Sequence, residues 1–150
     1  MVFQGACADP DLHYLIEPEP FRAEVRVSAD YPLDAAGELL HMVGFELVQV
    51  EPAQAQVSVY GWGVGCERPR ELAYTGTCGA IWVCKPPTPQ VLAHEIGHAV
   101  GAQHVPNSEG PAIMNPEIGA AQRMTELDAD AFRNRVLAGS IFDPECGLLP

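Results

Sequence analysis

The chain has 150 residues, of which 47% are hydrophobic and 19% are charged, a composition typical of a globular protein and not of a disordered one. This length fits one compact domain with a substantial core. The formal net charge is −12, so the overall field would repel nucleic acid and an anionic membrane surface, and we expect neither as a partner.

Hydrophobic periodicity predicts a strand, a helix and two further strands in the first half of the chain. Residues 1–20 are expected to form an N-terminal segment. Apolar and polar residues alternate over 21–28, which is the period of a half-buried strand. Over 33–43 the apolar residues recur at helical spacing. Alternation returns over 46–50 and 56–62, which predicts two more strands.

The second half of the chain predicts short strands followed by two helices. Residues 71–84 are typical of one or two short strands bounded by prolines. A helix is predicted over 88–101 and a last helix over 125–138, where Thr125 and Asp128 have the spacing of a helix cap. With no internal repeat or long linker, we expect the whole chain to form a single domain.

The cysteine content indicates an oxidising environment. No C-x-x-C pair of the kind that holds structural zinc is present, so disulfides with one cysteine left over are the favoured interpretation. The alternative is a cytosolic protein with buried free thiols. No apolar run approaches the ~20 residues that span a bilayer, and the first residues lack a signal pattern. We expect a soluble, secreted protein in which Met1 replaces a removed segment. The five cysteines are Cys7, Cys66, Cys78, Cys84 and Cys146.

A cluster of histidines in the predicted helix over 88–101 has the spacing of a metal chelate. His94 and His98 are four residues apart, so on a helix they share one face and can bind one ion. Gly101 permits a positive φ, which lets the chain leave the helix and bring His104 back to the same ion. Glu95 lies beside the first ligand, placed to reach a water at the open position of the metal.

Three neutral imidazoles and one water form the open tetrahedral site of a catalytic zinc ion, whereas a structural zinc would have a fourth protein ligand. Zinc lowers the pKa of its bound water, and Glu95 is expected to accept a proton from this water as it attacks a peptide carbonyl. The sequence therefore predicts a metalloendopeptidase with one Zn²⁺ ion. The alternative is an inactive zinc-binding module that acts as a binding or inhibitory protein.

The sequence resembles the metzincin zinc peptidases. Their signature H-E-x-x-H-x-x-G-x-x-H is matched over 94–104, and residues 113–116, Ile-Met-Asn-Pro, resemble their methionine turn, with Met114 as the floor of the site. The resemblance implies an α+β catalytic domain with a three-layer α/β/α-like arrangement. It would contain a twisted, mostly parallel sheet with an antiparallel edge strand, an active-site helix, the Met-turn and a C-terminal helix.

Among metzincins, the sequence is most similar to the matrixins and related small secreted members. We find no counterpart of their calcium and structural-zinc segments over 50–85, so a Ca²⁺ ion is without support. The resemblance implies a monomer that binds a protein or peptide substrate extended along an edge strand. Residues 115–120 would wall the pocket beyond the scissile bond. The implied substrate rim consists of Gly79, Ala80, Ile81, Trp82 and Val83.

Cys7 has two interpretations. Residues 7–11, Cys-Ala-Asp-Pro-Asp, resemble over three positions the matrixin pro-segment, in which a thiolate blocks the zinc. Only six residues precede Cys7, and we favour a disulfide instead, with Cys146 as the candidate partner.

Overall fold

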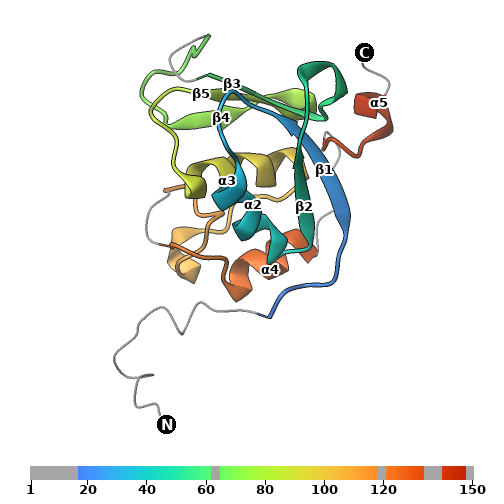
Figure 1. The fold of residues 1–150 in the computed structure, drawn as a ribbon. Coiled ribbons are helices and arrows are strands. Elements are labelled where there is room, and N and C mark those ends of the chain that lie inside the picture. Colours follow the sequence, from blue (N-terminus) through green and yellow to red (C-terminus); the bar gives the residue numbers. More distant parts are fainter. Residues whose placement is uncertain (1–16, 62–64, 118–120, 134–139, 148–150) are drawn as a thin grey trace.

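The computed structural model describes residues 17–61, 65–117, 121–133 and 140–147 (Figure 1). Within them, one sheet has the strand order β2-β1-β3-β5-β4, in which β4 is antiparallel to β5 and the other neighbours are parallel. The predicted α+β class with a mostly parallel sheet and an antiparallel edge strand is confirmed. The strands are β1 (Ala23–Ser28), β2 (Phe45–Gln49), β3 (Val57–Tyr60), β4 (Ala73–Thr75) and β5 (Ala80–Val83).

Three of the four described α-helices begin where the sequence predicts them, and the short helix near the C-terminus was not predicted. In α3, the Thr88 side chain accepts a hydrogen bond from Val91 N at 3.2 Å, which caps the first turn. In α4, Thr125 N donates to the Asp128 carboxylate at 3.0 Å, as the predicted cap requires. The rest of the predicted last helix, 134–138, lies outside the described residues. The helices are α2 (Asp34–His41), α3 (Pro89–Ala99), α4 (Glu126–Arg133) and α5 (Pro144–Gly147), with short 3₁₀ turns η2 (Pro52–Gln54), η3 (Thr77–Gly79) and η4 (Asn107–Glu109).

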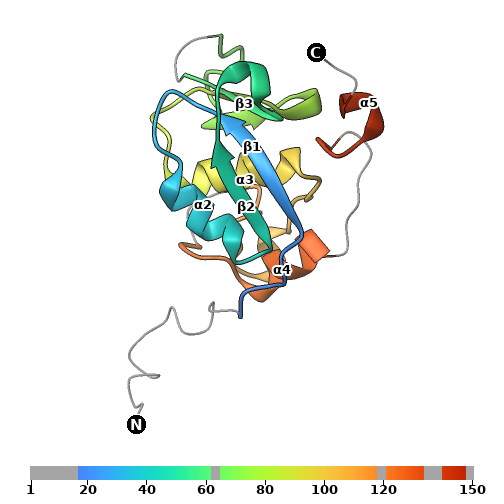
Figure 2. The ribbon, with the colours of Figure 1, turned by 45° about the vertical axis from the view of Figure 1, so that its right-hand side comes forward.

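The helices α2 and α3 cover one face of the sheet. In β1, Val25 and Val27 are fully buried, whereas Glu24 and Arg26 on the other face are exposed. Figure 2 shows α2 and α3 together beneath the buried face, and α4 lies farther below them. The expected α/β/α layering is therefore wrong for the described residues. The alternating pattern of β1 explains this, because a sheet covered on both faces needs apolar residues on both.

The strand that we expected at the substrate rim is an interior strand. β5 contributes Ala80, Ile81, Trp82 and Val83, and it lies between β3 and β4, with Ile81 and Val83 fully buried. Gly79 precedes it and is also buried. On this side of the sheet the edge strand is β4, because β5 pairs in parallel with β3 and the hairpin through η3 then leaves β4 outermost.

Two disulfides connect segments that are distant in the sequence. Cys66 is bonded to Cys84, and Cys78 is bonded to Cys146. The expected pairing of Cys7 with Cys146 is therefore wrong, and Cys7 itself lies outside the described residues. The turn between β4 and β5 meets α5 in space, which a sequence pattern does not reveal. Two disulfides indicate an oxidising, extracytoplasmic environment.

In the described part of the chain, no helix has both the length and the apolar character that crossing a membrane requires.

Candidate metal centre and active site

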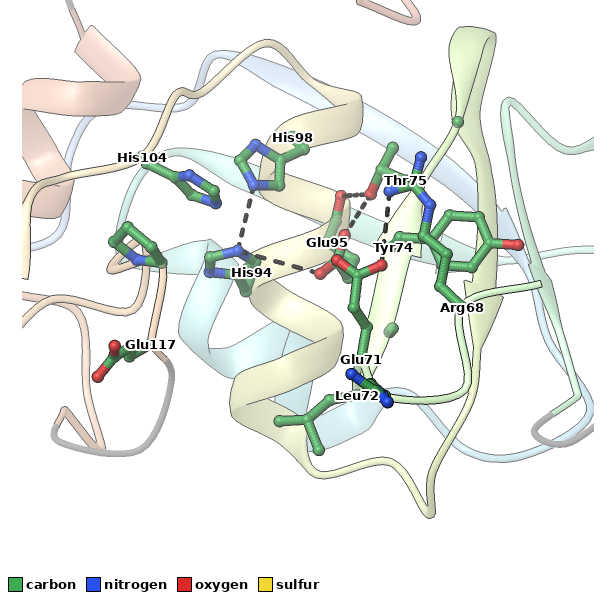
Figure 3. A pocket seen from close by; sticks show the side chains of 14 residues that line it. Arg68, Glu71, Leu72, Tyr74, Thr75, His94, Glu95, His98, His104 and Glu117 are labelled. Carbon is green, nitrogen blue, oxygen red and sulfur yellow. Dashed lines mark hydrogen bonds and ion pairs between the residues drawn. The ribbon is translucent and has the colours of Figure 1, made fainter. Parts of the chain in front are cut away.

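Three histidines converge at one point on the surface of α3 (Figure 3). His94 and His98 come from successive turns of the helix, and His104 comes from the loop that follows it. One ring nitrogen from each lies within 4.8 Å of the others, so the three could hold a metal ion. The prediction that these residues meet is confirmed.

Backbone carbonyls set the tautomers of the two helical histidines. His94 Nδ1 lies 2.7 Å from Ile113 O, and His98 Nδ1 lies 2.9 Å from Ala102 O. A carbonyl only accepts, so each Nδ1 donates its hydrogen and each Nε2 of a neutral ring carries a lone pair. The two Nε2 atoms are 3.1 Å apart. Two ligands at ~2.05 Å from a tetrahedral zinc ion would be about 3.3 Å apart, so this donor set fits such an ion.

Burial keeps these rings in the neutral form that binds a metal. It lowers the pKa of His94 to about 4, against an opposing contribution from the hydrogen bond to Ile113. Burial also lowers the pKa of His98. Because a protonated imidazole has no free lone pair, a lowered pKa leaves both rings available as ligands at neutral pH.

Gly101 makes the turn that brings in the third histidine. Its φ is 109°, a value that residues with a side chain rarely adopt. Ala102 N donates to Gly97 O at 2.9 Å across this turn, which ends α3 in the manner of a glycine C-cap. The chain then leaves the helix axis and reaches His104 three residues later. Gly101 therefore has the positive φ that the sequence analysis predicts.

Glu95 lies beside the histidines with its two carboxylate oxygens in different surroundings. Oε1 is 2.7 Å from Thr75 Oγ1, whereas Oε2 is 4.0 Å from His94 Nε2 on the metal side. The side chain is almost fully buried. Burial raises the pKa of Glu95 to about 7, the hydrogen bond from Thr75 opposes this, and the charge of Glu71 adds to it. A carboxyl group with a pKa near neutrality is suited to accept and return a proton.

The raised pKa predicts a pH-dependent difference in stability between the metal-free wild type and Glu95→Gln. Between pH 4.5 and about 7, the Glu95 carboxyl group of the folded wild type holds a proton that the unfolded chain has released. The contribution of this protonation to the stability of the fold is therefore complete below pH 4.5 and is lost as the pH rises through about 7. On going from pH 7.5 to pH 4.5, the free energy of unfolding of the wild type should rise by about 3 kcal/mol relative to that of the glutamine variant. Urea denaturation of both proteins, with disulfides intact, measures this difference, and an unchanged difference would contradict the prediction.

Met114 packs against α3. It is fully buried, and a Cβ added to Gly97 of α3 would lie 2.8 Å from its sulfur. Glycine at position 97 thus allows Met114 to approach the helix between the two histidine turns. The turn over 113–116 closes with a hydrogen bond from Asn115 N to Ala112 O at 3.2 Å. Met114 is thus buried in a tight turn against α3, and its role as the floor of a metal site stays a prediction.

Asp128 anchors this turn, a role that the sequence pattern did not reveal. Its buried carboxylate accepts hydrogen bonds from Ile113 N and Met114 N, both at 2.9 Å, besides the bond from Thr125 N. Burial raises its pKa, while these hydrogen bonds oppose the shift. Because Ile113 O in turn holds His94 Nδ1, the first turn of α4 is connected to the metal site. The cap spacing of Thr125 and Asp128 was the available signal, but it indicated only a helix start.

The amide of Asn115 supports the turn from the other side. Its oxygen accepts from Ala112 N at 2.8 Å, and its nitrogen lies 2.9 Å from Val105 O and 3.0 Å from Gly110 O. These bonds tie the Met-turn to the loop that carries His104.

A cleft of about 670 Å³ opens over the histidines. Of the expected substrate rim over 79–83, none of the residues lines it. Residues of β4 and of the loop before it do so instead, including Leu72 and Thr75. Pro116 and Glu117 line the opposite side, as expected for the pocket wall, whereas 118–120 lie outside the described residues.

No model of a known protein family matches the chain, and no curated protein matches it by sequence. The similarity of residues 94–104 and 113–116 to metzincins therefore stays an inference from the motif and from the site geometry.

Proposed function

We propose that this protein is a zinc-dependent endopeptidase of the metzincin type. The main support is the convergence of two Nε2 lone pairs and a third imidazole at one point, with one oxygen of Glu95 facing that point. A purely structural site would be closed by a fourth protein ligand, whereas the group found among the described residues has three histidines, which leave a position for water.

His94, His98 and His104 would hold the ion. Three imidazole nitrogens suit zinc better than calcium or magnesium, which prefer oxygen ligands. His94 and His98 are oriented by Ile113 O and Ala102 O, so their Nε2 lone pairs keep their direction before a metal binds.

Bound zinc would lower the pKa of a coordinated water and polarise the peptide carbonyl. Glu95 accepts the proton of the attacking water at Oε2, because Oε1 is occupied by the hydrogen bond to Thr75. The same oxygen then returns the proton to the nitrogen of the leaving amine.

The substrate would bind in extended form along β4. Among the described strands only β5 pairs with β4, so the other edge of β4 can form backbone hydrogen bonds with a peptide. Thr75 and Leu72 place this edge along the cleft that contains the histidines. The two disulfides agree with secretion as the setting for such a peptidase.

A mixed peptide library tests the proposal. The zinc-loaded protein should contain about one ion per chain by elemental analysis and should cleave internal peptide bonds. Cleavage should stop with the chelator 1,10-phenanthroline and return when zinc is added. Zinc binding without cleavage of any peptide would instead support an inactive zinc-binding module. A protein that binds no zinc would contradict both functions.

A further inference from the structure

The side chain of Thr75 connects the edge strand to the active-site helix. Its Oγ1 lies 2.7 Å from Glu95 Oε1 and 2.9 Å from the backbone oxygen of the same residue (Figure 3). Both partners are acceptors, so the single hydroxyl hydrogen is shared between them, and the shorter contact is the one to Oε1. Thr75 is half-buried and belongs to β4, whereas Glu95 belongs to α3. The hydroxyl therefore fixes one carboxylate oxygen relative to the strand along which a peptide would lie.

The two oxygens of Glu95 differ as a result. Oε1 is occupied by Thr75, and Oε2 faces the histidines at 4.0 Å from His94 Nε2. A carboxylate without such a contact can rotate about its last side-chain bond, because this torsion is broad. One hydrogen bond to Oε1 is thus sufficient to hold Oε2 toward the metal.

A second carboxylate lies near Glu95 and acts on its charge, in addition to the hydrogen bond from Thr75. The Glu71 carboxylate also lies at the cleft, and its charge acts on Glu95. Arg68 is 3.5 Å from Glu71, a separation at which the two exposed groups interact weakly. Within the described part of the chain, Thr75 is the side chain that donates a hydrogen bond to Glu95.

We propose that Thr75 is a positioning residue, which orients the Glu95 carboxylate for proton transfer through the bond from Thr75 Oγ1 to Glu95 Oε1. This assignment rests on the proposed peptidase function, since it concerns the rate of that reaction. It requires only the hydroxyl, so serine should replace threonine and valine should not. A role in packing alone would reverse this order, because valine keeps the volume of threonine and serine does not.

Steady-state kinetics of zinc-loaded variants on a peptide that the wild type cleaves tests this assignment. Thr75→Val should lower kcat by about tenfold to a hundredfold with KM within about twofold, because the base is misplaced while the substrate still binds. Thr75→Ser should retain kcat within about threefold. Thr77→Val, which removes an exposed hydroxyl two residues away, should match the wild type.

Two outcomes would overturn the role of Thr75. One is a Thr75→Val enzyme with wild-type kcat, and the other is a Thr75→Ser enzyme as slow as Thr75→Val. If the wild type binds zinc but cleaves no peptide, the proposed function fails, and crystal structures of zinc-loaded wild type and Thr75→Val decide the positioning role separately. A rotated or disordered Glu95 carboxylate in the valine variant would support that role, and an unmoved one would refute it.

Discussion

Replacing Glu95 by glutamine should lower the rate of peptide hydrolysis by about 10²- to 10⁴-fold. The amide has nearly the same shape as the carboxylate, but it cannot accept a proton from the attacking water, and a general base contributes a factor of this size. The effect should appear in kcat and in kcat/KM alike, because proton transfer occurs in the transition state and not in substrate binding.

Zinc binding separates this role from that of a ligand. Glu95 Oε2 is 4.0 Å from His94 Nε2, and the three imidazoles suffice to hold the ion, so Glu95→Gln should bind as much zinc as the wild type. Glu126→Gln is a matched control, since it makes the same chemical change at an exposed position on α4, and its rate should equal that of the wild type. A Glu95→Gln protein that cleaves peptides at the wild-type rate would refute the mechanism.

Replacing Asp128 by alanine should destabilise the fold by at least about 3 kcal/mol. The carboxylate accepts three backbone hydrogen bonds in the interior, from Ile113, Met114 and Thr125, and its loss leaves three buried donors without an acceptor. The desolvation of the charge, which raises the pKa of Asp128, offsets part of what these bonds contribute. Urea denaturation at pH 7 with disulfides intact measures the effect.

The same substitution should weaken zinc binding. Without Asp128 the Met-turn is no longer tied to α4, and Ile113 O no longer holds His94 Nδ1 in place. Asp128→Asn should be intermediate, because its amide keeps one acceptor oxygen. Asp130→Ala serves as the control, since this exposed residue forms a surface ion pair with Arg133, and its loss should cost less than about 1 kcal/mol. If Asp128→Ala lowers the free energy of unfolding by no more than the Asp130→Ala control does, the anchoring role is disproved.

The convergence of the three histidines could be predicted well because its determinants are local. Two histidines four residues apart on a helix share a face whatever the rest of the chain does. Gly101 ends the helix by a conformation that depends on its own lack of a side chain, and His104 follows within reach. Periodicity likewise predicted the strands and the starts of α3 and α4, because alternation and capping involve neighbours in the sequence.

The organisation of the sheet was less predictable. Residues 80–83 have the composition of a strand at any position, and only their parallel pairing with β3 moves them inside and leaves β4 at the edge. The placement of α2 and α3 on the same face of the sheet also depends on how the connections between the parallel strands pack. The partner of Cys146 is a further example, because Cys78 reaches it through a turn 68 residues away in sequence.

The sequence by itself therefore determined which residues could bind a metal ion and which carboxylate accompanies them. Those features follow from helical geometry and from the chemistry of imidazole, carboxylate and glycine. Only the tertiary structure decided how the site is held: Thr75 reaches Glu95 from the edge strand, and Asp128 reaches the Met-turn from α4. Such contacts join residues far apart in the chain. Their partners are selected by packing, and a local pattern carries no record of that selection.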